Sequence, residues 1–170
     1  MQSEDYKALE AIKKSWDKLG FQTRLYPISK EIPVPVLTIA LQTDYKEDVL
    51  ALDLAFTPFS KEEIQYTRFL QMSIELEADV TEENKSDILQ FANQVNTIVP
   101  LGQFTILNNR IAYRYTYPMS NAVSAADNSC LETISLYSVL AIEYSTIFSK
   151  LASGIITLSE ACTSFLDNKF

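Results

Sequence analysis

The sequence predicts an α+β fold, in which helices pack on one face of an antiparallel sheet of about five strands, in the order α-β-β-β-α-β-β-α. Period-two alternation of polar and apolar residues over 66–80 predicts a long strand, and paired shorter runs predict hairpins. Helical periodicity marks both ends of the chain. We expect a single domain over residues 1–170, because this length suits one core and no repeat or low-complexity linker interrupts it.

The first element is expected to be a helix over residues 4–19. Its apolar residues recur at spacings of three and four: Leu9, Ile12, Trp16 and Leu19. The side chain of Ser3 or Asp5 is suited to cap its start. Three prolines between 27 and 35 then mark a connector, so a strand around residues 21–26 must end there or lie at a sheet edge.

The middle of the chain is expected to form most of the sheet. Runs 36–42 and 49–56 alternate in hydrophobicity, and the polar segment 43–47 between them is typical of a hairpin turn. Over 66–80 the even-numbered residues are mostly apolar and the odd-numbered ones mostly polar. One face of this strand is therefore expected in the core and the other in water, as in an antiparallel sheet covered on one side.

A second helix and a hairpin are expected next. The helix begins near 81–84 and is expected to end at Pro100, with an apolar stripe of Ile88, Leu89, Phe91, Ala92, Val95, Ile98 and Val99. In the hairpin, the Asn108-Asn109 pair tolerates the positive φ angles of a two-residue turn, and Pro118 ends the return strand.

A long helix from about Asp127 to Ser153 carries a wide apolar surface. The apolar residues that widen it past half of the circumference are Leu131, Ile134, Leu136, Tyr137, Leu140, Ala141, Ile142, Tyr144, Ile147, Phe148 and Leu151. Such a helix must be covered on more than one side. The sheet covers one side, and either another helix of the same chain or a second protomer covers the rest. A short last helix, about 159–166, follows.

Composition argues against most kinds of chemistry. The chain has 22 acidic and 14 basic residues and a net charge of −8, so we expect no nucleic acid partner, because phosphate binding needs Lys and Arg. It has no histidine, which removes the commonest general base and metal ligand. Its three glycines lie too far apart to form a phosphate-binding loop. We therefore predict no catalytic residue, no metal site and no cofactor.

The cysteines and the N-terminus favour an intracellular protein. Cys130 and Cys162 match no zinc spacing and sit among small and apolar residues, so buried free thiols are expected, with a disulfide as the alternative. Residues 1–16 lack the apolar stretch of a signal peptide, and no run reaches the ~18 apolar residues that cross a bilayer. We expect a cytoplasmic protein with no membrane contact.

Residues 88–118 resemble the YbjN family, which belongs to the type III secretion chaperone-like fold. The similar features are the helix end Phe-Ala-Asn-Gln-Val-Asn at 91–96, the strand start Pro-Leu-Gly-Gln-Phe at 100–104, and the strand Ala-Tyr-Arg-Tyr at 112–115. The long C-terminal helix also fits, and the likeness is strongest over 66–155. The resemblance implies a binding fold, often dimeric, that is chaperone-like or regulatory. It implies no catalytic residue.

Charged side chains on the predicted sheet allow a functional and a structural interpretation. Glu75, Glu77 and Asp79 share the wet face of one strand. They form a cation or acid–base site only if their oxygens converge, and otherwise a solvated face. Arg110 and Arg114 lie on one face of a later strand, where they could oppose Glu75 or Glu77 across the sheet.

We predict a non-enzymatic protein-binding module, chaperone-like or regulatory, that acts as a homodimer with a protein partner that the sequence does not identify. A stripe of three tyrosines on the last strand belongs either to the core or to a contact surface. The candidate protein-contact residues are Tyr137, Leu140, Tyr144, Ile147, Phe148, Leu151, Tyr113 and Tyr115. The alternative is a small-molecule or peptide sensor with a pocket between sheet and helices. An enzyme that relies on Asp, Glu, Tyr or Lys alone is a third hypothesis.

Overall fold

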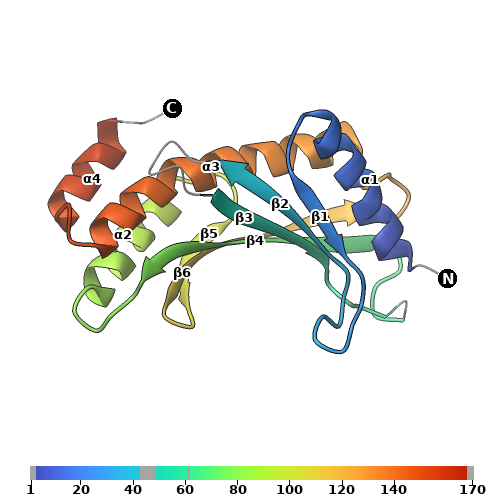
Figure 1. Cartoon of the computed structure of the whole chain (residues 1–170), viewed down its shortest axis with the longest axis horizontal. Helices are drawn as coiled ribbons and strands as arrows, with labels where there is room; N and C mark the ends of the chain where they lie inside the picture. The colour runs from blue at the N-terminus through green and yellow to red at the C-terminus, as the bar shows by residue number, and fades with distance from the viewer. Residues whose placement is uncertain (1–2, 43–48, 61, 168–170) are drawn as a thin grey trace.

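The computed structural model describes residues 3–42, 49–60 and 62–167 and has the predicted α+β fold (Figure 1). Its elements are α1 (Glu4–Lys18), β1 (Thr23–Tyr26), β2 (Val36–Gln42), β3 (Val49–Phe56), β4 (Thr67–Asp79), α2 (Lys85–Asn96), β5 (Gln103–Leu107), β6 (Arg110–Ser120), α3 (Asn128–Ala152) and α4 (Leu158–Asp167). The predicted turn at 43–47 lies outside the described residues.

The sheet has six strands, each antiparallel to its neighbours, in the order β1-β2-β3-β4-β6-β5. The strand beyond the expected five is β1, which pairs with β2 at the edge, as the prolines of the following connector require. Asn108 and Asn109 join β5 to β6 with φ angles of 50° and 59°, which confirms the predicted tight turn.

The helices begin and end close to the predicted residues, with one exception. The side chains of Ser3 and Asp127 each accept a hydrogen bond from the main-chain N–H three residues on, which caps α1 and α3. The exception is α2, which ends at Asn96 and not at Pro100. The two residues after Asn96 donate to carbonyls three positions back, and this tighter turn closes the helix early.

The helices cover one face of the sheet and leave the other open (Figure 1). α1 packs against β1, β2 and β3, while α3 lies across β4 with contacts to β2 and β6. α2 packs beside β5, and α4 packs against α2 and α3. Alternate apolar side chains of the central strands fill the space below α3: Leu37, Ile39, Leu41, Leu50, Leu52, Leu54, Leu70, Met72, Ile74 and Leu76.

Candidate protein-contact surfaces

Most of the predicted contact residues lie in the core of the folded chain. Those at most 4% exposed are Tyr113, Tyr137, Leu140, Tyr144, Phe148 and Leu151. Ile147 and Tyr115 are partly buried against the same core. The sheet, α2 and α4 cover α3 on these sides. Of the two predicted ways to cover this helix, by the same chain or by a second protomer, these contacts belong to the first. Of the eight predicted contact residues, only Ile147 and Tyr115 have surface that another protein could contact while the chain stays folded.

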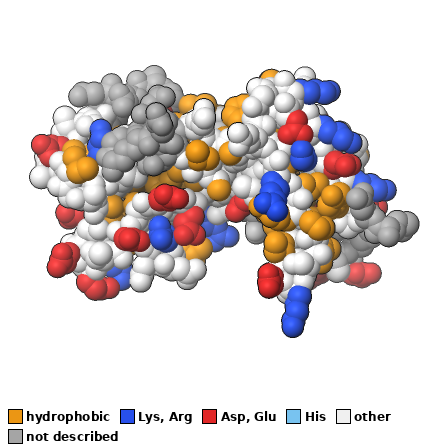
Figure 2. All heavy atoms as spheres, viewed as in Figure 1, with side chains coloured by type: hydrophobic (Ala, Val, Ile, Leu, Met, Phe, Trp, Pro, Cys, Tyr) orange, Lys and Arg blue, Asp and Glu red, His pale blue; other side chains and the backbone are white. Residues whose placement is uncertain are grey.

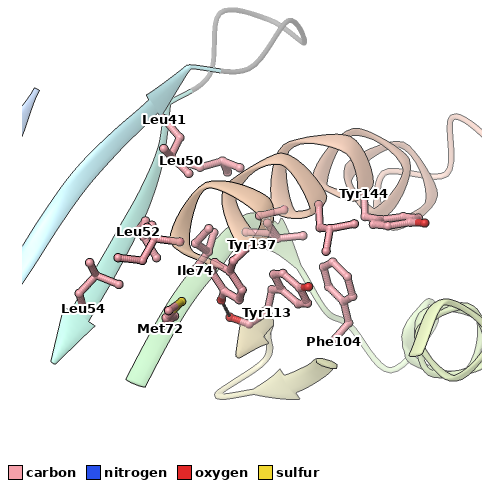
Figure 3. Packing of buried hydrophobic residues seen from close by; sticks show 14 of the residues in the cluster. Leu41, Leu50, Leu52, Leu54, Met72, Ile74, Phe104, Tyr113, Tyr137 and Tyr144 are labelled. Carbon is pink, nitrogen blue, oxygen red and sulfur yellow. Dashed lines mark hydrogen bonds between the residues drawn. The ribbon is translucent and has the colours of Figure 1, made fainter. Parts of the chain in front are cut away.

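An aromatic stack explains why these tyrosines lie inside (Figure 3). The ring of Tyr113 on β6 lies between Phe104 of β5 and Tyr137 of α3, with ring centroids 4.2 and 4.5 Å apart. The Tyr113 hydroxyl donates to the carbonyl of Leu101, and the Tyr137 hydroxyl donates to the carbonyl of Tyr113 at 2.5 Å. Because each buried hydroxyl has an acceptor, the polar tip of the side chain does not prevent its burial.

The open face of the sheet is a broad surface of small and polar side chains. One row of facing residues crosses all six strands: Arg24, Thr38, Asp53, Ser73, Arg114 and Gln103. Over β4, β6 and β5 this face holds a groove of about 590 Å³, whose lining includes Gln71, Ser73, Gln103, Thr105, Arg114 and Thr116. Figure 2 shows the molecule hollowed between the β1–β2 connector at lower right and the β5–β6 hairpin at lower left.

The carboxylates on this face are solvated, and one arginine lies beside two of them. Arg110 Nε lies 3.5 Å from Asp79 Oδ1 and 3.9 Å from Glu75 Oε1. Arg110 therefore lies beside Glu75, as the sequence allowed, but its partner across the sheet is Asp79, whereas Arg114 faces Ser73. Within the described ranges, no group of three or more potential metal ligands comes together.

A side chain closes the β5 edge of the sheet. Asn96, at the end of α2, accepts a hydrogen bond from the Phe104 N–H at 2.7 Å and donates one to the Phe104 carbonyl at 2.9 Å. Its amide takes the place that a neighbouring strand would occupy, which opposes the pairing of a further strand there. A partner is therefore better accommodated on the open face than along this edge.

Two further surfaces expose apolar side chains. On the outer side of α3, Leu136 is 41% and Val139 is 56% exposed. At the tip of the β1–β2 connector, Ile28 is exposed, and the Ser29 hydroxyl accepts hydrogen bonds from two main-chain N–H groups that shape the turn. Figure 2 shows apolar side chains gathered along this connector. Exposed apolar groups of this kind are common at protein contacts.

Burial keeps the Cys130 thiol away from solvent. Both cysteines are free; Cys130 is buried and Cys162 partly buried. Burial raises the pKa of the Cys130 thiol to about 11, so little reactive thiolate forms near neutral pH. In the part of the chain that the structure describes, no helix has the length and hydropathy to cross a membrane.

Comparison with protein-family models and with curated proteins identifies no relative. No protein-family model matches the chain, and no curated protein is significantly similar to it. The likeness of residues 88–118 to the YbjN family therefore stays a prediction.

Proposed function

We propose that this chain is a non-enzymatic protein-binding module, chaperone-like or regulatory, that holds a partner on the open face of its sheet. The observation that carries the proposal is the groove over β4, β6 and β5. Its hydroxyl and amide side chains can hydrogen-bond to the main chain of a partner, and their small size leaves the floor accessible. A YbjN-like, cytoplasmic role is part of the same proposal and rests on the sequence.

The position of the side chains with raised pKa values supports a binding role over an enzymatic one. Burial raises the pKa values of Tyr113, Tyr137 and Cys130, and all three side chains are packed in the core. An active site is expected to gather such perturbed groups in an accessible cleft. Here the two tyrosine hydroxyls are taken up by hydrogen bonds that hold α3 and the start of β5 to β6.

The groove is tested by placing a long charged side chain on its floor. Ser73→Arg fills the centre of the open face, and we expect it to abolish capture of a partner that wild type retains stoichiometrically from a native lysate. Ser86→Arg, at an exposed position on α2, is the matched control and should retain the partner. Equal capture by both variants, or no stoichiometric partner of wild type, would contradict the proposal.

We also propose that the chain forms a homodimer through the outer face of α3. Two copies of a surface centred on Leu136 and Val139 can pack against each other about a two-fold axis. Light scattering of the wild-type protein should give twice the chain mass of 19.3 kDa. The double variant Leu136→Lys/Val139→Lys should have the mass of a single chain. Leu89→Lys, on a similarly exposed position of α2, should leave the dimer intact. A wild-type mass of one chain at micromolar concentration would rule this dimer out.

A further inference from the structure

A second cavity lies at the end of the sheet where α1 begins. It is a cleft of about 900 Å³, formed by the first turn of α1, the end of β3, the connector to β4 and the start of β4. Its lining includes Asp5, Phe56, Phe59, Ile64 and Arg68. Strand alternation turns Arg68 to the helix-covered face, so this cleft is separate from the groove on the open face. Its volume is that of a small-molecule site.

Packing against described parts of the chain, and no hydrogen bond to them, holds the Arg68 side chain in this cleft. Its side chain is only 23% exposed, and the guanidinium carbon lies 4.7 Å from the centre of the Phe56 ring. Among the residues that the structure describes, Nε is buried without a hydrogen-bond partner. Asp5 Oδ1 lies 3.9 Å from Nη1, which is too long for a hydrogen bond. A guanidinium has five N–H donors, so the terminal amino groups remain available to an acceptor that enters the cleft.

The surroundings of Arg68 define which acceptor fits. A carboxylate or a phosphate can accept two parallel hydrogen bonds from the planar donors of an arginine, and a charge-assisted bond is stronger than a neutral one. Glu4 and Asp5 line the same cleft, so an acceptor with two negative charges is disfavoured. Phe59, which is 50% exposed, and the partly buried Ile64 provide an apolar wall for the rest of the ligand.

We propose that this cleft binds a small organic monocarboxylate with an apolar or aromatic tail, with its carboxylate on Arg68 and its tail against Phe59. The cleft shares no lining residue with the open-face groove. A failure of this proposal would therefore leave the protein-binding proposal untouched, and the reverse also holds. Asp5 competes with the ligand for Arg68, because it is the acidic group that faces Nη1. Replacing Asp5 by a neutral residue should therefore tighten binding.

The test uses 3-phenylpropionate as the probe, titrated into the full chain and followed by two-dimensional ¹H–¹⁵N NMR. We expect saturable shifts around the cleft, with binding at least about tenfold weaker for 3-phenylpropionamide and for inorganic phosphate. Arg68→Gln should weaken binding of the acid at least about tenfold, whereas Asp5→Asn should tighten it. Arg24→Gln is the matched control, because Arg24 stacks on Tyr26 at 4.8 Å, on the face opposite to Arg68. It should leave the affinity unchanged.

Several results would overturn the proposal. They are equal binding of acid and amide, wild-type affinity in a folded Arg68→Gln variant, and no saturation of the wild-type chain by about 10 mM probe. If loss of the stacking on Phe56 unfolds the Arg68→Gln variant, Asp5→Asn decides, because Asp5 is partly exposed at the first turn of α1. Failure of Asp5→Asn to tighten binding would then count against the site.

Discussion

Gly102→Ala is expected to lower the free energy of unfolding by about 2–4 kcal/mol. Gly102 has a φ of +70°, where a residue with a β-carbon is strained. The added carbon would also lie 2.8 Å from the carbonyl oxygen of Arg114 and 3.0 Å from the ring of Tyr113. That ring cannot move aside, because it is stacked between Phe104 and Tyr137. The chain at β5 must therefore shift away from β6, which loosens the aromatic stack.

Gly154→Ala separates the two causes of this loss. Gly154 also has a φ of +70°, but an added β-carbon there meets no atom of the described residues within 4 Å. In both variants the unfolded chain becomes less flexible by the same amount, and both gain the same stabilisation from this. The difference between their free energies of unfolding therefore measures the close contact of the new β-carbon at residue 102 with Arg114 and Tyr113. Urea denaturation should show Gly102→Ala less stable than Gly154→Ala by about 1–3 kcal/mol. Equal midpoints would show that β5 and β6 are not packed as closely as described.

Local patterns in the sequence were sufficient to predict most of the fold. The alternation over 66–80 needs no partner to be recognised, because a strand between core and water buries every second side chain. The Asn108-Asn109 turn and the Ser3 cap depend on residues within four positions of each other. β1 was harder to assign, since it has four residues and only its position before the prolines marked it as an edge.

The surfaces could not be predicted in the same way, because they depend on contacts between distant elements. The apolar width of α3 did not reveal that α2 and α4 would pack against it, with Phe91 of α2 against Phe148. The Arg68 cleft joins Asp5, Phe59 and Arg68 from three separate segments. One sequence signal pointed to it: Arg68 falls on the apolar face of β4, and a charge at such a position needs an explanation.

Stability should fall steeply above pH 10, and the aromatic stack should be a principal cause. Burial raises the pKa values of Tyr113 and Tyr137 above the ordinary value near 10, and that of Cys130 to about 11. Groups whose pKa is higher in the folded chain stabilise it fully below their unfolded pKa values. This stabilisation is lost as pH rises past those values, because the unfolded chain then releases protons that the folded chain retains. At pH 11 the loss is about 1.4 kcal/mol for each tyrosine and about 2 kcal/mol for Cys130.

Tyr137→Phe tests this assignment through the pH dependence of stability and not through stability alone. At pH 8 the variant lacks the hydrogen bond to the Tyr113 carbonyl and should be about 1 kcal/mol less stable than wild type. Between pH 9 and 11 it should lose about 1.4 kcal/mol less than wild type does, so the two unfolding free energies converge. Tyr66→Phe, at a side chain that is 80% exposed, should follow the wild-type curve. Parallel curves for wild type and Tyr137→Phe would show that the hydroxyl of Tyr137 ionises equally easily in the folded and the unfolded chain.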